Sequence, residues 1–494
     1  MIASVWNKER LMLRAFPLGA ITLLCWFVWH AVTSGAYGYE EWLLFYVIAL
    51  MCWEPTATWL RQGCHWMPAA ELFFLLHLPY YVNPFVSGRE EYLNLSAELR
   101  TKEGLVIFVF LLFCRLCYQT AGMRGKKTTG LLERELLIVG QRRRFVWIGL
   151  MCWFVFNLTL LQSWLPNLAE YFNTVRVIFS SIGVISIFVL FYEMGCRHLT
   201  GKAEILLGTL TILTLLISFA SGFLIEGTIQ AALAFVAFSI GRKKMPVAAM
   251  LVLVLILSFL HIGKGRMRVQ FWEQGKNYGS VASNPLEIYR VWIAAAWEEL
   301  LSGRAAEDKT ASLLERGNLL QFLSRVVAET PDTLPYLDGT TYQLSLANFV
   351  PRFLWPDKPR ASAPDEMLAI YYRYQTVESV ESTAVGLGRI SEAWANFGWL
   401  GVAVIGVAMG LLLRIAKQLS HGYSPAHFRF LLATSFIPFA LNLEGGFGPA
   451  VHAFTQNLFI SFIGLWIMSK PLTTVSAPAP VPLPMNAKVS SGVA

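Results

Sequence analysis

Residues 246–263, PVAAMLVLVLILSFLHIG, contain no aspartate, glutamate, lysine or arginine. A helix rises about 1.5 Å per residue, so a run of this length crosses a hydrocarbon core about 30 Å thick. No single soluble core could bury many such runs. This stretch therefore predicts a transmembrane helix. Because similar stretches recur along the chain, they decide the fold class.

Similar apolar blocks lie on both sides of it. Hydrophobic residues make up 55% of the 494 residues and charged residues 15%, whereas soluble chains carry about 25% charge. The third block is interrupted by Pro79 and Pro84, which favours a re-entrant or interfacial segment there. We predict an all-α polytopic membrane protein of about twelve spans, near 15–33, 42–60, 69–86, 103–121, 145–164, 174–193, 204–220, 225–241, 246–263, 392–413, 427–443 and 450–469.

The net charge of +8 comes from lysines and arginines in short connections between these blocks. They lie at the N-terminus, near Arg61, in 124–144 and 242–244, and at Lys470, and with twelve spans they all fall on one side. The positive-inside rule makes that side the cytoplasm, so both termini are expected there, in a bacterial inner membrane. No basic, aromatic-interleaved domain is present, and a nucleic-acid partner is not expected.

One long polar connection interrupts the apolar pattern. The chain divides into a bundle of about nine spans (1–263), a loop outside the cytoplasm (264–391), about three further spans (392–470) and a tail expected to be disordered (471–494). Within the loop, 286–301 and 312–329 have the apolar spacing of amphipathic helices near the membrane surface. We expect 343–360 to pack over the mouth of a cavity.

The cations of this loop are most concentrated in residues 348–360, NFVPRFLWPDKPR. Arg352 and Arg360 each present a planar fork of donors that matches phosphate oxygens, Lys358 adds a point charge, and three prolines fix the backbone. The alternative is a structured loop whose cations pair with Asp357, Asp365 and Glu366. The loop contains neither histidine nor cysteine, which excludes a Cys/His zinc site there, and we expect no metal and no cofactor.

A second candidate site lies where the loop enters the next span. On a helix, Arg389, Glu392 and Asn396 share one face, and an ionisable pair at a membrane entrance usually faces a cavity. The alternative is an Arg–Glu pair that only caps the span. Further along the span, Gly406 and Gly410 form a G-x-x-x-G pattern, which predicts close packing against another helix.

These stretches carry a resemblance to a known family. VPRFLWPDKP (350–359) and EAWANFG (392–398), preceded by ETP (329–331) and PYLDGTTY (335–342), resemble the external loop of the Wzy-like polysaccharide polymerases, also called oligosaccharide repeat-unit polymerases. The match covers about 316–410. It implies a GT-C-like membrane glycosyltransferase that joins undecaprenyl-diphosphate-linked oligosaccharides into O-antigen or exopolysaccharide at the periplasmic face.

That chemistry suggests roles for the candidate residues. Arg352 and Arg360, with Arg268 or Arg389, would bind the donor diphosphate, and Glu392 would activate or orient the acceptor hydroxyl. Lys358 and Asn396 would also contact substrate. The expected partners are the lipid-linked oligosaccharide, the bilayer, a chain-length regulator and a flippase. An O-antigen ligase, a transporter or flippase of lipid-linked sugars, and a non-enzymatic scaffold are the alternatives.

Overall fold

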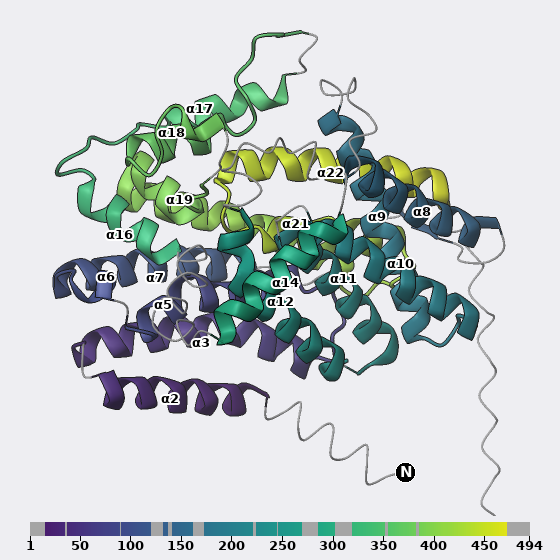
Figure 1. The fold of residues 1–494 in the computed structure, drawn as a ribbon, viewed down its shortest axis with the longest axis horizontal. Coiled ribbons are helices and arrows are strands. Elements are labelled where there is room, and N and C mark those ends of the chain that lie inside the picture. The colour runs from purple at the N-terminus through teal and green to yellow at the C-terminus, as the bar shows by residue number, and fades with distance from the viewer. Residues whose placement is uncertain are drawn as a thin grey trace, which may run out of the picture.

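The structure, a computed structural model, describes residues 15–34, 37–88, 90–119, 132–136, 141–161, 172–220, 224–244, 246–268, 285–301, 319–350, 354–381 and 385–471. Nearly all regular structure in these ranges is helical (Figure 1).

The elements follow one another along the chain with bounds close to the apolar blocks of the sequence. They are α2 (Ala15–Ser34), α3 (Tyr39–Arg61), α4 (Ala69–His77), the π-helix η1 (Leu78–Val82), α5 (Asn83–Val86), α6 (Glu90–Leu93), α7 (Ala97–Gln119), β1 (Arg134–Glu135), α8 (Gln141–Leu161), α9 (Phe172–Gly195), α10 (Gly201–Ala220), α11 (Leu224–Arg242), α12 (Val247–Arg268), α14 (Pro285–Leu301), α16 (Leu319–Glu329), α17 (Thr340–Leu346), the 3-10 helix η4 (Ala347–Phe349), α18 (Ala363–Tyr371), the 3-10 helix η5 (Ser379–Glu381), α19 (Arg389–Ser420), α20 (Phe428–Ala433), α21 (Phe436–Leu441), α22 (Phe447–Met468) and β2 (Lys470–Pro471).

Among the described residues, seven helices are long and apolar enough to cross a membrane: α2, α3, α9, α10, α12, α19 and α22. Shorter apolar helices occur at Arg144–Leu158, Gly227–Arg242 and Phe428–Leu441. The prediction of an all-α membrane protein is confirmed at this level. The count of twelve spans stays a prediction.

Two of the expected spans are interrupted helices. In 69–86, α4 passes into the π-helix η1 and then α5, with Pro79 and Pro84 each in the first turn of the element it enters. Proline has no N–H to donate, so the regular α-helical bonding cannot continue unchanged through these positions. In 427–443, α20 ends and α21 begins around Thr434 and Ser435.

The centre of the bundle is the contact between α19 and α7. Gly406 and Gly410 face the backbone of α7, and a Cβ added at Gly406 would lie 2.7 Å from the carbonyl oxygen of Phe110. At Gly410 the nearest atom is the carbonyl oxygen of Cys114. The close packing predicted from the G-x-x-x-G pattern is therefore confirmed.

The polar connection carries both helices that the apolar spacing predicts. The second predicted helix is α16, whose buried face includes Leu320, Leu323 and Val327, and residues 312–318 of that prediction lie outside the described ranges. The buried Ser324 donates to the carboxylate of Glu103 in α7 at 2.8 Å, which ties α16 to the bundle. Figure 1 shows α16, α17 and α18 gathered beside α19.

The first predicted helix, α14, packs against α12. The Trp292 indole N–H donates to the carbonyl of Leu260, and Arg266 pairs with Glu298 at 3.2 Å. The contact at Arg266 and Glu298 lies six residues later in both helices than the contact at Leu260 and Trp292. The helix α14 therefore runs alongside α12 in the same direction.

Segments far apart in sequence meet at a short sheet. β1 pairs antiparallel with β2, and Glu135 bridges to His427. Arg134 donates to the hydroxyl of Ser469 at 2.7 Å. These segments belong to connections that the charge pattern assigns to one side of the membrane, so their meeting agrees with that assignment.

Candidate functional site

The candidate site begins where the polar connection enters α19. Gly388, the N-cap of α19, has φ of 83°, a left-handed conformation that suits glycine. Its N–H donates to the carbonyl of Glu444 at 2.9 Å. The start of α19 is thus fixed to the 442–446 connection between α21 and α22.

Two carboxylates meet at the first residues of α22. Glu392, from the first turn of α19, accepts a hydrogen bond from the backbone N–H of Phe447 at 2.5 Å. Asp365, from the first turn of α18, accepts one from the N–H of Gly446 at 3.0 Å. Unsatisfied N–H groups at a helix start favour negative charge, so this end of α22 stabilises both side chains.

Gly446 separates the two acids with little room to spare. A Cβ added there would lie 2.6 Å from Oδ1 of Asp365 and 3.0 Å from Oε2 of Glu392. Oε1 of Glu392 is buried and has no hydrogen-bond partner among the described residues. A buried oxygen left unpartnered costs free energy, and Oε2 of Glu71 and Oε1 of Glu103 are in the same situation elsewhere in the bundle.

Arg389 lies on the same helix but turns toward α21. Its guanidinium donates to the carbonyls of Phe439 at 3.0 Å and Asn442 at 2.7 Å, and stacks 4.5 Å from the Phe439 ring centroid. No ion pair within 4.0 Å joins it to Glu392. Arg389 therefore occupies the carbonyls that end α21 and holds the 442–446 connection in place.

Asn396 connects the site to α17. Its amide donates to the Thr341 hydroxyl at 2.9 Å and the Glu392 carbonyl at 2.8 Å, and its oxygen accepts from the N–H of Gly339 at 3.0 Å. Every polar atom of this buried side chain is thus bonded within the site. The helix kinks directly afterwards, at Phe397 and Gly398.

A small cavity lies behind Arg389. It has a volume of about 10 Å³ and is lined by Phe73, His77, Tyr81, Phe110, Arg389, Ile390 and Leu443. That is room for about one water molecule. The buried Nε of Arg389, which has no partner among the described residues, belongs to one of the lining side chains.

Burial sets the protonation of the acid outside the spans. The pKa of Asp365 is raised from 3.8 to about 6, chiefly by burial and in smaller part by the charge of Glu366, against the opposing effects of the Gly446 N–H and the positive charge of Arg389. Loss of hydration disfavours the charged carboxylate more than these partners favour it. Asp365 therefore changes charge close to neutral pH.

The structure brings together only part of the predicted site. Arg389, Glu392 and Asn396 are all buried at the start of α19, where every residue from 389 to 396 is buried. The ammonium of Lys358 donates to the carbonyls of Val350 at 2.7 Å and Asn348 at 3.3 Å. The Arg360 side chain is 58% exposed and lies 4.0 Å from Glu366.

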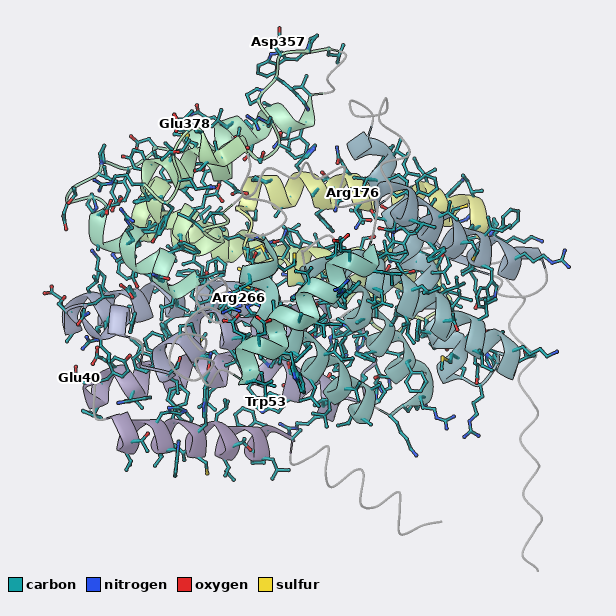
Figure 2. The ribbon with its side chains drawn as sticks, in the orientation of Figure 1. Glu40, Trp53, Arg176, Arg266, Asp357 and Glu378 are labelled. Carbon is teal, nitrogen blue, oxygen red and sulfur yellow. The ribbon has the colours of Figure 1, made fainter. Side chains whose placement is uncertain are left out.

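Two predicted cations cannot be placed. Arg352 lies outside the described residues, and Arg268 is the last residue of α12, where only the backbone is described. Figure 2 shows Asp357, from the same segment as Lys358, at the tip of a projection from the helices.

Sequence reasoning missed the second acid. Asp365 was considered only as a counter-ion for the loop cations, whereas the structure pairs it with the Gly446 N–H. One signal was available, because the pair Gly445-Gly446 precedes the last span and permits close approach to a backbone. Within the described ranges, no three acidic, histidine or cysteine side chains converge as metal ligands.

Comparison with known proteins places this chain in a family. The family model described as "Domain of unknown function (DUF8712)" matches residues 141–425, from the first residue of α8 to just beyond α19. Comparison with curated proteins gives no match, and comparison with solved structures gives none. Because the matched region is more than half of the chain, the protein belongs to the family described as a domain of unknown function (DUF8712).

Proposed function

We propose that this protein is a membrane glycosyltransferase that polymerises undecaprenyl-diphosphate-linked oligosaccharides. The proposal starts from the resemblance of 316–410 to the Wzy-like polymerases. The observation that carries it in the structure is the buried Glu392, whose Oε1 is unpartnered beside a second acid at the end of a membrane helix. A carboxylate held this way suits the activation of a hydroxyl group.

The proposed reaction transfers a growing chain between two lipid-linked sugars. The acceptor hydroxyl oxygen bonds to the anomeric carbon of the donor, while the bond from that carbon to the diphosphate oxygen breaks. The hydroxyl proton passes to Glu392, and the diphosphate leaves on its lipid with the electron pair of the broken bond. Asn396 and Asp365 hold Glu392 in position, through its backbone carbonyl and the shared Gly446–Phe447 turn.

The leaving diphosphate needs fixed cations outside the bundle. We propose Arg352 and Arg360 for this role, together with Arg268. Arginine keeps its positive charge, and its planar guanidinium can donate two N–H groups to two phosphate oxygens at once. Lys358 and Arg389 donate to backbone carbonyls, and we assign them to positioning the loop and the 442–446 connection. No metal or cofactor takes part, so activity in purified membranes should survive EDTA.

The proposal also places the protein in a cell. The positive-inside pattern puts both termini in the cytoplasm and the 264–391 loop outside it, in a bacterial inner membrane. A flippase would deliver the lipid-linked repeat units to that side, and a chain-length regulator would act with the polymerase.

The test is a polymer-ladder assay normalised to the amount of protein in the membrane. Glu392→Gln should reduce polymer by roughly 100- to 1,000-fold, as removal of preorganised catalytic groups does. Glu378→Gln is the matched control, because Glu378 is an exposed acid in the same polar loop. Ladders of wild-type length and yield from both Glu392→Gln and Arg360→Ala would overturn the proposed site.

A further inference from the structure

The chain between α17 and α18 projects from the helices, and large apolar side chains are exposed both where it leaves α17 and further along it. Leu346 is 66% exposed, Phe349 49%, Leu354 67% and Trp355 44%. We call these four residues the apolar tip. Leaving such side chains in water is unfavourable, because apolar surface gains stability when it is removed from water. An exposed set of this size therefore needs an environment that covers it.

The projection is fixed at its base. The Asn348 side-chain amide donates to the carbonyl of Ala361 at 3.3 Å, which joins the point where the chain leaves to the point where it returns. The Lys358 ammonium donates to the carbonyl of Val350 at 2.7 Å within the same base. In Figure 2 the labelled Asp357 stands at the far end, away from the helices. Leu354 and Trp355, the part of the apolar tip nearest Asp357, are thus held outward, whereas Leu346 and Phe349 belong to its base.

The base lies directly against a membrane helix. Ser345 of α17 approaches Gly448 of α22 so closely that a Cβ at Gly448 would overlap it. The Phe349 ring packs edge-on against the His452 ring, with centroids 5.1 Å apart and planes at 87°. His452 lies in the second turn of α22, a helix able to span the membrane. Phe349 therefore lies within the length of that helix, near its start.

The side of α22 that Phe349 covers is its lipid-facing side. His452, Phe459 and Ile463 fall within about 40° of one another around a helix of 3.6 residues per turn. Phe459 is 66% exposed and Ile463 is 42% exposed, as expected for side chains in contact with acyl chains. The apolar tip thus continues a surface that the bilayer already covers.

We propose that the apolar tip inserts into the boundary between headgroups and acyl chains of the leaflet at the start of α22. Tryptophan favours this boundary because its ring is apolar and its N–H remains near water. Arg360, exposed at the base, has the length to reach lipid phosphates while Leu354 and Trp355 enter the apolar layer. A bilayer fits better than a second copy of the chain, because the surface is a narrow tip continuous with the lipid-facing side of α22.

This inference does not depend on the proposed enzymatic function. It gives this segment a physical role of its own: the Asn348–Ala361 and Lys358–Val350 hydrogen bonds hold a projection whose apolar end is anchored in lipid. The loop would then keep a fixed height relative to the membrane surface. Any ligand bound beneath it would be held at a defined depth.

The experiment uses a variant without its seven native cysteines, labelled at Trp355→Cys with an environment-sensitive fluorophore. Phosphatidylcholine vesicles carry spin-labelled lipids, with the quencher either near the headgroup or deep in the acyl chains. The matched control is Glu378→Cys, which is fully exposed and which Figure 2 shows on a different part of the loop. A second label at Leu346→Cys tests the base of the apolar tip.

Labels at positions 355 and 346 should show blue-shifted emission and at least about twofold stronger quenching by the shallow quencher than the label at 378. Equal, weak quenching at all three positions would overturn the proposal. Blue-shifted emission that arises only at high protein density, without quenching by lipid, would assign the apolar tip to a second copy of the chain instead. Both readouts are independent of polymer synthesis.

Discussion

Asp365 and Glu392 accept hydrogen bonds from two consecutive backbone N–H groups, those of Gly446 at 3.0 Å and Phe447 at 2.5 Å. One acid comes from the polar loop and the other from a membrane helix. A third helix, α22, supplies both donors. Three parts of the chain are therefore joined by two adjacent peptide groups.

Gly446 should not tolerate a side chain. Gly446→Ala would place its Cβ 2.6 Å from the Asp365 carboxylate, and the forced separation should cost about 1–3 kcal/mol in the free energy of unfolding. The matched control is Gly464→Ala on the same helix, where a Cβ meets nothing within 4 Å and should be neutral or slightly stabilising. Thermal unfolding in lipid nanodiscs measures both. Equal midpoints for the two variants would contradict the tight fit.

Asp365 should make stability depend on pH. Its pKa is about 6 in the folded protein and 3.8 ordinarily, so the folded state binds more protons between these values. The free energy of unfolding should therefore fall as pH rises from 4 to 6, by at most about 3 kcal/mol from this residue.

The measurement is the thermal midpoint across this pH window. Asp365→Asn should flatten the pH dependence, whereas Glu366→Gln should only reduce it, because the negative charge of Glu366 is one of the causes that raise the Asp365 pKa. An unchanged slope in Asp365→Asn would show that other groups carry the effect.

Loss of the buried Arg389 side chain should destabilise the fold more than loss of an exposed arginine. Arg389→Ala removes the donors from the carbonyls of Phe439 and Asn442, and buried carbonyls left unpaired should cost about 1–3 kcal/mol each. Arg373→Ala is the control: Arg373 pairs with Glu329 at 3.0 Å with its side chain 64% exposed, and its loss should cost less than about 1 kcal/mol. Membrane abundance and thermal midpoint report the difference. Similar losses in the two variants would contradict the assignment of Arg389 to the 442–446 connection.

The kink in α19 should require Gly398. This residue has φ of 54° and ψ of −134°, and an added Cβ would lie 2.6 Å from the Tyr336 hydroxyl. Gly398→Ala should lower stability by about 1–3 kcal/mol, because both the backbone conformation and the contact are strained. Gly208→Ala in α10, where a Cβ meets nothing within 4 Å, should be tolerated. Gly398→Ala with a thermal midpoint equal to that of Gly208→Ala would show that the kink relaxes freely.

Sidedness gives a further test. Cysteines placed at Glu378 in the loop and at Lys244 between α11 and α12 should differ in their access to an impermeant thiol reagent. In cells with a permeable outer membrane, position 378 should react and position 244 should react only after inner-membrane lysis. The reverse pattern would invert the predicted topology.

Apolar spacing predicted the helices well because it is a local property of the chain. Residues 246–263 and 286–301 lie in α12 and α14, and the Gly406/Gly410 pattern correctly indicated close packing, since a missing side chain acts wherever two helices meet. The interruption between α20 and α21 was not predicted. There the Thr434 hydroxyl donates to the carbonyl of Leu431 at 2.6 Å, and side-chain bonds of this kind compete with the hydrogen bonds of a regular helix.

The site was predictable only where its residues share a helix. The spacing singled out Arg389, Glu392 and Asn396 as candidates, but hydrogen-bond partners such as the Phe447 N–H are backbone groups that sequence does not mark. Lys358 lies in a cationic stretch that predicts anion binding. In the structure its ammonium donates instead to backbone carbonyls eight and ten positions earlier in the chain. Charge alone does not reveal which cations a loop uses for its own closure.

The joining of Asp365 and Glu392 at Gly446 and Phe447 has a consequence for biosynthesis. The ribosome makes both acids before it makes the two peptide groups that receive them. Until the nascent chain reaches Gly446 and Phe447, the loop lacks its final attachment to α22. During that time the two acids must remain solvated or protonated. Docking of the loop therefore waits for the last apolar helix to enter the membrane, and a chain released before residue 446 should present an unattached loop to quality-control proteases.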